Sequence, residues 1–250
     1  MNKLAFVTLT NYGYREYTDN MIESLERLGI GDIMNIYCID EDAFKYFEEK
    51  RPNNKVYLIK NLYGKKVKEF VAYQEDDWED IVYNKLNLIK RLLEKNIDVI
   101  FVDGDIVFLK NPIEDLKDKI KKYPDTDVFF QNDCQKGDSS QELICSGFMY
   151  LRATASNIDL LYPFNKQFNF SENGVYPFRK NFIICDQLYF NAVKSTVNYK
   201  CFKVGDYSNG YHWKQLRDND DYDPYLIHFN WLKGHKKMKE MKKYGYWRGV

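Results

Sequence analysis

The sequence predicts an α/β fold in which helices flank a mostly parallel central sheet. In the first half of the chain, short apolar runs alternate with amphipathic stretches, a pattern typical of parallel strands joined by helices. The chain has 250 residues, of which 44% are hydrophobic and 17% aromatic, so it can bury a sizeable core. It contains no repeat, no low-complexity tract and no linker rich in Pro, Gly or Ser. We therefore predict a single domain over residues 1–250.

The first four strands are predicted from apolar runs, and three amphipathic stretches separate them. The strands lie at 4–10, 33–39, 55–60 and 97–102. The first helix places Met21, Leu25 and Leu28 on one face and is closed by Gly29, and a second, short helix covers 41–50. A long helix at 78–96 has apolar residues spaced four, three and four positions apart, namely Val82, Leu86, Ile89 and Leu93.

The second half of the chain is less regular. We predict strands at 127–131, 143–151 and 199–204 and a buried helix at 182–193. The polar and aromatic segment 203–223 predicts a loop that helps to form a site.

Charge and cysteine content exclude several classes of protein. Lys plus Arg and Asp plus Glu both number 37, so no overall field attracts nucleic acid or an anionic membrane. The five cysteines are widely spread and form no C-x-x-C pair, which argues against a disulfide framework and a zinc ribbon. No signal peptide and no apolar window of the ~20 residues that a bilayer requires is evident. We therefore expect a cytoplasmic protein without a membrane span.

An acid pair interrupts the apolar sequence near the middle of the chain. Asp103, Gly104 and Asp105 follow the strand at 97–102, where ligands bind in open α/β sheets. Two adjacent carboxylates repel each other unless a cation or a shared proton intervenes, and such oxygen ligands suit Mg²⁺ or Mn²⁺. Gly104 lets a ligand approach closely. Because these cations complete their shell with water and phosphate oxygens, a diphosphate ligand is predicted.

The motif is short, so three other interpretations stay open. A surface turn can carry two acids without any function. A haloacid-dehalogenase-like phosphatase also places an acid pair after an apolar strand, with Asp103 as the nucleophile. That signature normally follows an early strand and leads into a Thr, whereas Ile106 follows here. A non-catalytic protein that binds nucleotide sugars is the third.

Five blocks extend the pattern beyond the acid pair: VTLTNYGY, YNKLNLIKRLLEKNIDVIFVDGDIVFLKNP, ICSGFMYLRAT, CDQLYFNAV and YLIHFNWLKGHKKMKEMKKYGYW. In this order they resemble the GT-A (Rossmann-like) glycosyltransferases over almost the whole chain. The resemblance is to the nucleotide-diphospho-sugar transferases close to plant arabinosyl- and xylosyltransferases, which also occur in giant DNA viruses and would there act in the host cytoplasm. It implies metal-dependent transfer of a hexosyl or pentosyl group from a nucleotide sugar, expected to be a UDP-sugar, to a glycan or glycoprotein acceptor.

The resemblance also implies how the chain is divided and which residues bind the donor. Residues 1–110 would form the nucleotide-binding half and residues 111–250 the sugar and acceptor half. The side chains expected to hold the nucleoside and diphosphate are Thr8, Thr10, Asn11, Tyr12 (or Tyr14 in its place) and Lys85.

The last block implies the third metal ligand. His228, at the end of an apolar run, would join Asp103 and Asp105, and its imidazole nitrogen suits Mn²⁺ better than Mg²⁺. Gly234 would allow close approach to the diphosphate, and either Lys236 or Lys237 would offset the diphosphate charge. The run HKKMKEMKK is expected to form a basic helix, and most of its lysines are expected to lie on the solvated face of that helix.

Short polar side chains of the second half would bind the sugar. By resemblance these are Gln131, Asn132, Asp133, Ser146, Gly147, Asp186 and Gln187. Asp186 and Gln187 are the predicted catalytic residues, because one of them would lie near the anomeric carbon in a reaction that retains the configuration. A buried acid such as Asp186 needs a partner or a function; a helix cap is the structural alternative.

Overall fold

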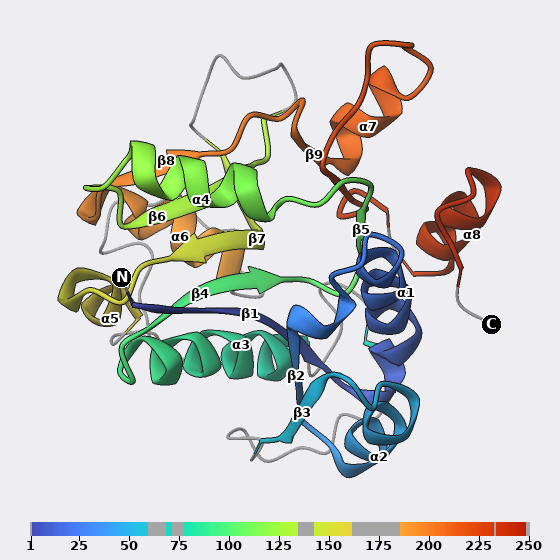
Figure 1. Cartoon of the computed structure of the whole chain (residues 1–250), viewed down its shortest axis with the longest axis horizontal. Coiled ribbons are helices and arrows are strands. Elements are labelled where there is room, and N and C mark those ends of the chain that lie inside the picture. The colour runs from blue at the N-terminus through green and yellow to red at the C-terminus, as the bar shows by residue number, and fades with distance from the viewer. Residues whose placement is uncertain are drawn as a thin grey trace, which may run out of the picture.

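The computed structural model describes residues 2–59, 69–71, 78–134, 143–161, 186–232 and 234–248. In these residues, seven strands form a central sheet in the order β3-β2-β1-β4-β7-β6-β8 (Figure 1). Neighbouring strands pair in parallel except for β7, which is antiparallel to both β4 and β6. The mostly parallel sheet predicted from the sequence is therefore confirmed. The strands are β1 (Lys3–Thr10), β2 (Met34–Cys38), β3 (Lys55–Leu58), β4 (Ile97–Val102), β6 (Val128–Asn132), β7 (Ile144–Leu151) and β8 (Tyr199–Cys201).

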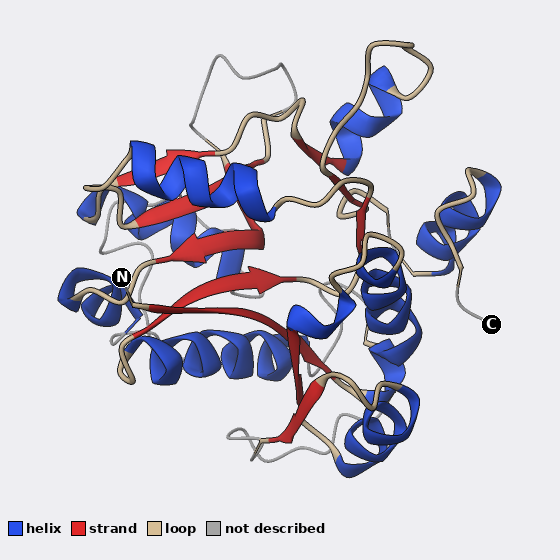
Figure 2. Ribbon diagram, in the orientation of Figure 1, coloured by secondary structure: helices blue, strands red, loops and turns tan. Residues whose placement is uncertain are grey.

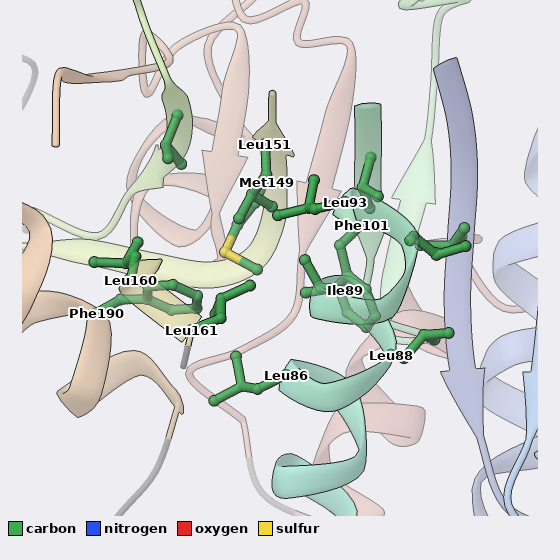
Figure 3. Packing of buried hydrophobic residues seen from close by; sticks show 14 of the residues in the cluster. Leu86, Leu88, Ile89, Leu93, Phe101, Met149, Leu151, Leu160, Leu161 and Phe190 are labelled. Carbon is green, nitrogen blue, oxygen red and sulfur yellow. The ribbon is translucent and has the colours of Figure 1, made fainter. Parts of the chain in front are cut away.

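Helices cover both faces of this sheet because the strand residues alternate in direction. Val99 and Phe101 of β4 pack against α3, α5 and α6, whereas Ile100 and Val102 pack against α1, α2 and α4. Figure 3 shows the first of these cores, where α3 lies over β4 and β7. The helices are α1 (Arg15–Glu26), α2 (Glu41–Lys50), α3 (Trp78–Leu93), α4 (Ile113–Lys122), α5 (Ala155–Leu161) and α6 (Asp186–Val193).

The bounds of several helices follow from local chemistry. The carboxylate of Asp40 accepts a hydrogen bond of 2.8 Å from the backbone N–H of Ala43 and so begins α2 at the predicted residue. The long helix α3 ends three residues before its predicted end because Asn96 adopts a left-handed conformation with φ 58°. The predicted helix at 182–193 is helical from Asp186 onward, and residues 182–185 lie outside the described part of the chain.

A second, smaller sheet lies beyond the carboxyl end of β4 (Figure 2). In it, β10 (Leu226–His228) pairs antiparallel with β5 (Ile106–Phe108) and parallel with β9 (Tyr207–Asn209). The prediction of a loop at 203–223 is therefore wrong in its first part, since β9 and α7 (Gly210–Leu216) fall within it.

The reason for this difference is burial, which the polar composition of the segment conceals. Tyr207 and Trp213 are completely buried. The side chain of Asn209 accepts hydrogen bonds from the backbone N–H groups of Tyr211 and His212 and begins α7. The predicted strand at 199–204 is also shorter, because β8 ends at Cys201. Among the described residues, no helix has both the length and the apolar character needed to cross a membrane.

Candidate functional site

A cavity of about 400 Å³ opens at the carboxyl ends of β1 and β4. The main sheet, the small sheet and α8 (His235–Lys243) all contribute to its wall. Most of the predicted site residues line this cavity. They come from distant parts of the sequence, since Thr10 and Lys237 are 227 positions apart. The predicted residues in its lining are Thr10, Asn11, Lys85, Asp103, Gly104, Asp105, Asp133, Ser146, Asp186, Gln187, His228, Gly234 and Lys237.

The acid pair forms the turn that joins the two sheets. After β4, the backbone N–H of Asp103 donates to the carbonyl of Gly147 at 2.8 Å, and the chain turns into β5. A Cβ atom on Gly104 would lie 2.5 Å from the hydroxyl oxygen of Thr18 in α1. Packing against α1 therefore requires a glycine between the two acids, in addition to any approach by a ligand.

Asp103, Asp105 and His228 converge on one point. Their ligand atoms all lie within 4.8 Å of one another. The Nε2 atom of His228 lies 3.2 Å from Oδ1 of Asp105 and 3.9 Å from Oδ2 of Asp103. His228 reaches this point from β10, and the backbone N–H of Phe229 donates to the carbonyl of Asp105. Two carboxylates and one imidazole nitrogen are a suitable donor set for a divalent cation such as Mn²⁺.

A buried lysine connects the acid pair to the predicted catalytic residues. The Nζ atom of Lys85, on α3, lies 2.7 Å from Oδ2 of Asp186 and 3.1 Å from Oδ1 of Asp103, and it donates to the carbonyl of Ser146 at 2.8 Å. Burial alone would lower the pKa of Lys85, but the attraction of Asp103 and Asp186 outweighs it and raises the pKa. Lys85 therefore stays a cation in the wall of the cavity.

A second cation comes from α8. The ammonium group of Lys237 contacts the carboxylate of Asp105 and is buried, whereas Lys236 is exposed and lies outside the cavity lining. Burial would raise the pKa of Asp105, but Lys237 and His228 hold it well below its usual range. Gly234, before the helix, has φ 50°, a left-handed conformation that favours glycine. Of the two predicted lysines, Lys237 lines the cavity and Lys236 does not.

The two acids of the pair differ electrostatically. Burial and the neighbouring Asp105 raise the pKa of Asp103, although Lys85 acts in the opposite direction. The pKa values of the two carboxyl groups are therefore pushed apart, as expected for close like charges.

In another part of the cavity wall, Asp133 is held by three neutral donors. Its carboxylate accepts from Nε2 of Gln187 at 2.9 Å, Nδ2 of Asn230 at 2.9 Å and Nε1 of Trp231 at 3.3 Å. Burial raises the pKa of Asp133 in spite of these hydrogen bonds. Asn230 and Trp231 line the cavity but were not predicted. They come just after Phe229, which follows the strand that carries His228, and this position is the signal that could have identified them.

Aromatic rings also line the cavity beside the first loop, which follows β1. Asn11 donates to the carbonyl of Glu69 at 3.0 Å and accepts from the backbone N–H of Tyr14 at 2.9 Å. The ring of Tyr14 stacks on Phe70, with centroids 5.4 Å apart and planes 6° apart. Both rings line the cavity. Phe70 was not predicted, because nothing in its sequence surroundings links it to the first loop.

Six predicted residues lie outside the cavity lining. Thr8 is buried within β1, and Tyr12 is 37% exposed beneath the guanidinium group of Arg15. Of the two predicted tyrosines, Tyr14 therefore lines the cavity and Tyr12 does not. Gln131 and Gly147 contact His228 but do not line the cavity themselves. The side chain of Asn132 accepts a hydrogen bond from the backbone N–H of Cys134. Lys236 is the sixth.

The fold matches solved glycosyltransferases along nearly the whole chain. Galactosyltransferase LgtC, in complex with donor and acceptor sugar analogues, has a TM-score of 0.61 at 11% identity, with 98% of this chain and 97% of that chain covered. Mouse xyloside xylosyltransferase 1 has a TM-score of 0.57 at 14% identity, with 92% and 97% covered. At this identity the likeness concerns the fold, which is that of GT-A glycosyltransferases.

Sequence comparison leads to the same group of proteins. The UDP-galactose:fucoside alpha-3-galactosyltransferase of Dictyostelium discoideum is 22% identical over 286 residues, which include 96% of this chain. The chain spans only 42% of the length of that relative. A family model described as nucleotide-diphospho-sugar transferase matches residues 33–241. The protein therefore belongs to the nucleotide-diphospho-sugar transferase family.

Proposed function

We propose that this protein transfers a glycosyl group from a nucleotide diphosphate sugar to a hydroxyl group of a glycan or glycoprotein and that it needs a divalent cation. The observation that carries the proposal is the convergence of Asp103, Asp105 and His228 between two lysines in one cavity. The expected cation is Mn²⁺, because the imidazole nitrogen favours it over Mg²⁺.

The charges in the cavity support a requirement for a cation. Four carboxylates line the described part of the cavity, against two ammonium groups: Asp103, Asp105, Asp133 and Asp186 against Lys85 and Lys237. A diphosphate alone would meet an excess of negative charge. A divalent cation held by the two acids and His228 would neutralise this excess of negative charge and, when bound, stabilise the charge that develops on the leaving diphosphate.

UDP is the expected nucleotide. The relative from Dictyostelium discoideum is named for UDP-galactose and a fucoside, which supports a UDP-sugar donor and a sugar acceptor. In the proposed binding mode, Asn11 and the stacked rings of Tyr14 and Phe70 hold the nucleoside, and Lys237 contacts the diphosphate.

We assign Asp186 and Gln187 to the reacting sugar and expect the configuration to be retained. Lys85 holds Asp186 at 2.7 Å, and the amide nitrogen of Gln187 is engaged by Asp133, so the amide oxygen of Gln187 is the atom that it can present to the sugar. A neutral oxygen there would steady an oxocarbenium-like centre, while the acceptor hydroxyl attacks from the side of the leaving group.

Thermal unfolding tests the proposal directly. UDP is expected to raise the melting temperature of the wild type only when Mn²⁺ is present, by the stabilisation of about 2.7 kcal/mol that a ligand at 100 times its Kd provides. In Asp105→Asn this stabilisation is expected to disappear, while the exposed control Asp118→Asn behaves like the wild type. Hydrolysis of a panel of UDP-sugars then identifies the donor.

Other outcomes would point to the alternatives. Stabilisation by GDP in place of UDP would change the assigned donor but keep the metal site. Release of phosphate from p-nitrophenyl phosphate, lost in Asp103→Asn, would indicate a phosphatase. Binding of UDP and Mn²⁺ without hydrolysis or transfer of any UDP-sugar would indicate a non-catalytic binding protein.

A further inference from the structure

We propose that Gln131 is a positioning residue that holds His228 in the tautomer needed to bind the cation. The inference rests on the proposed metal-dependent function, and it gives Gln131 a role different from the sugar contact expected from the sequence. Gln131 is completely buried and lies outside the cavity lining, so its side chain reaches the site through His228.

The orientation of the Gln131 amide follows from its neighbours. A shift of register in the pairing of β6 with β7 occurs between Phe130 and Gln131 and is the kind of irregularity that redirects a side chain. The amide nitrogen donates to the backbone carbonyls of Ser208 at 3.0 Å and Tyr207 at 3.3 Å. If the amide were rotated by half a turn, its oxygen would face these two carbonyl oxygens. The amide oxygen must therefore point to the opposite side.

On that opposite side lies His228. The amide oxygen of Gln131 is 2.8 Å from Nδ1 of His228. Because this oxygen can only accept, Nδ1 must carry the proton and donate. The Sγ atom of Cys145 is also near, at 3.5 Å, but sulfur is a weaker acceptor. In a neutral imidazole the other nitrogen then has a free lone pair.

That other nitrogen is the one that faces the acid pair. Nε2 of His228 lies 3.2 Å from Asp105 and 3.9 Å from Asp103, so in the neutral ring its lone pair faces the place between the two acids that a cation would occupy. The ring cannot turn easily, because Gly147 packs so closely that a Cβ atom there would lie 2.1 Å from Cε1 of His228. Hydrogen bonds thus connect the backbone of β9 to the amide of Gln131 and this amide to the imidazole of His228, which faces the proposed metal site.

Binding of Mn²⁺ without any nucleotide tests the assignment. Free Mn²⁺ is measured by electron paramagnetic resonance with the wild type, Gln131→Met, His228→Ala and the double variant. Gln131→Met keeps the length of the side chain but removes the acceptor. It is expected to weaken Mn²⁺ binding about 10- to 100-fold, the usual effect of losing the partner of a ligating histidine. In the His228→Ala background the same change is expected to have little effect.

Two results would overturn the inference: unchanged Mn²⁺ affinity in Gln131→Met, or an equal loss in both backgrounds, which would indicate a general structural role. A spectroscopic readout is independent of affinity. In protein loaded with diamagnetic Cd²⁺ and labelled with ¹⁵N-histidine, His228 is expected to be protonated at Nδ1, and protonation at Nε2 would contradict the proposal. Asp103→Asn tests the proposed function separately. If this variant binds Mn²⁺ as tightly as the wild type does, the proposed metal site is wrong, whatever the result for Gln131→Met.

Discussion

The two sheets of this protein differ in how they are built, and the site needs both. In the main sheet, β1 to β4 follow one another in the sequence with a helix between each successive pair, and they pair in parallel. In the small sheet, β5 and β10 are more than 100 positions apart, yet they place His228 beside Asp105. Local patterns reveal the first kind of structure, whereas the second depends on contacts between distant segments.

The largest expected effect is on the free energy of unfolding, and it tests whether the region of the small sheet is as firmly packed as that of the main sheet. Trp213 on α7 and Phe47 on α2 are both completely buried. Replacing either by Ala is expected to lower the free energy of unfolding by about 3–5 kcal/mol. Urea unfolding of the two variants measures this. A loss below about 0.5 kcal/mol in Trp213→Ala would show that the segment 203–223 behaves like the surface loop predicted from its sequence.

A smaller effect is expected at the contact between the two regions, where Lys237 of α8 reaches Asp105. Lys237→Met is expected to weaken binding of UDP in the presence of Mn²⁺ about 10- to 100-fold, because hydrogen bonds to charged groups contribute about 1.5–3 kcal/mol. Calorimetric titration provides the measurement. The matched control is Lys236→Met, which changes the neighbouring, exposed lysine and should leave the affinity unchanged. Equal losses in the two variants would indicate that only the general positive charge of α8 matters.

The smallest effect concerns two cysteines. Burial, assisted by Asp40, raises the pKa of Cys38 in β2 to about 12, whereas Cys201 in β8 is half-buried. An unfolded chain loses this thiol proton near pH 8.5, so the contribution of Cys38 to stability is complete below that pH and falls as the pH rises toward 12. At pH 8.5, iodoacetamide is expected to modify Cys201 well before Cys38, as measured by peptide mapping. Equal rates in the native protein would contradict the difference in burial.

Much of the first region could be predicted from its sequence. The helix at 41–50 was predicted to the residue, and β4 was predicted at 97–102, because amphipathic spacing and an N-cap are local signals. The acid pair was identified as a ligand site from its place at a strand end, and it lies in the cavity. By contrast, α4, α5, β9 and α7 were not predicted, since their elements are short or polar and are stabilised by packing on the rest of the chain.

The candidate site shows the same division. Resemblance to a family located His228, but it assigned Gln131 to the sugar and left Lys236 and Lys237 undecided. The folded chain adds their positions: Gln131 contacts His228 on the side away from the cavity, Lys237 is buried against Asp105, and Lys236 is exposed. Phe70 joined the site without any sequence signal, because its contact with Tyr14 bridges distant segments.

The sequence by itself therefore determined the class of fold, most strands of the main sheet and the acid pair that lines the cavity, because periodicity, caps and strand-end acids act over a few residues. The tertiary structure alone decided which nitrogen of His228 faces the acids, which lysine enters the cavity and which aromatic rings line the cavity. Each of these depends on distances of about 3 Å between groups that are tens to hundreds of positions apart, and only packing of the whole chain sets such distances.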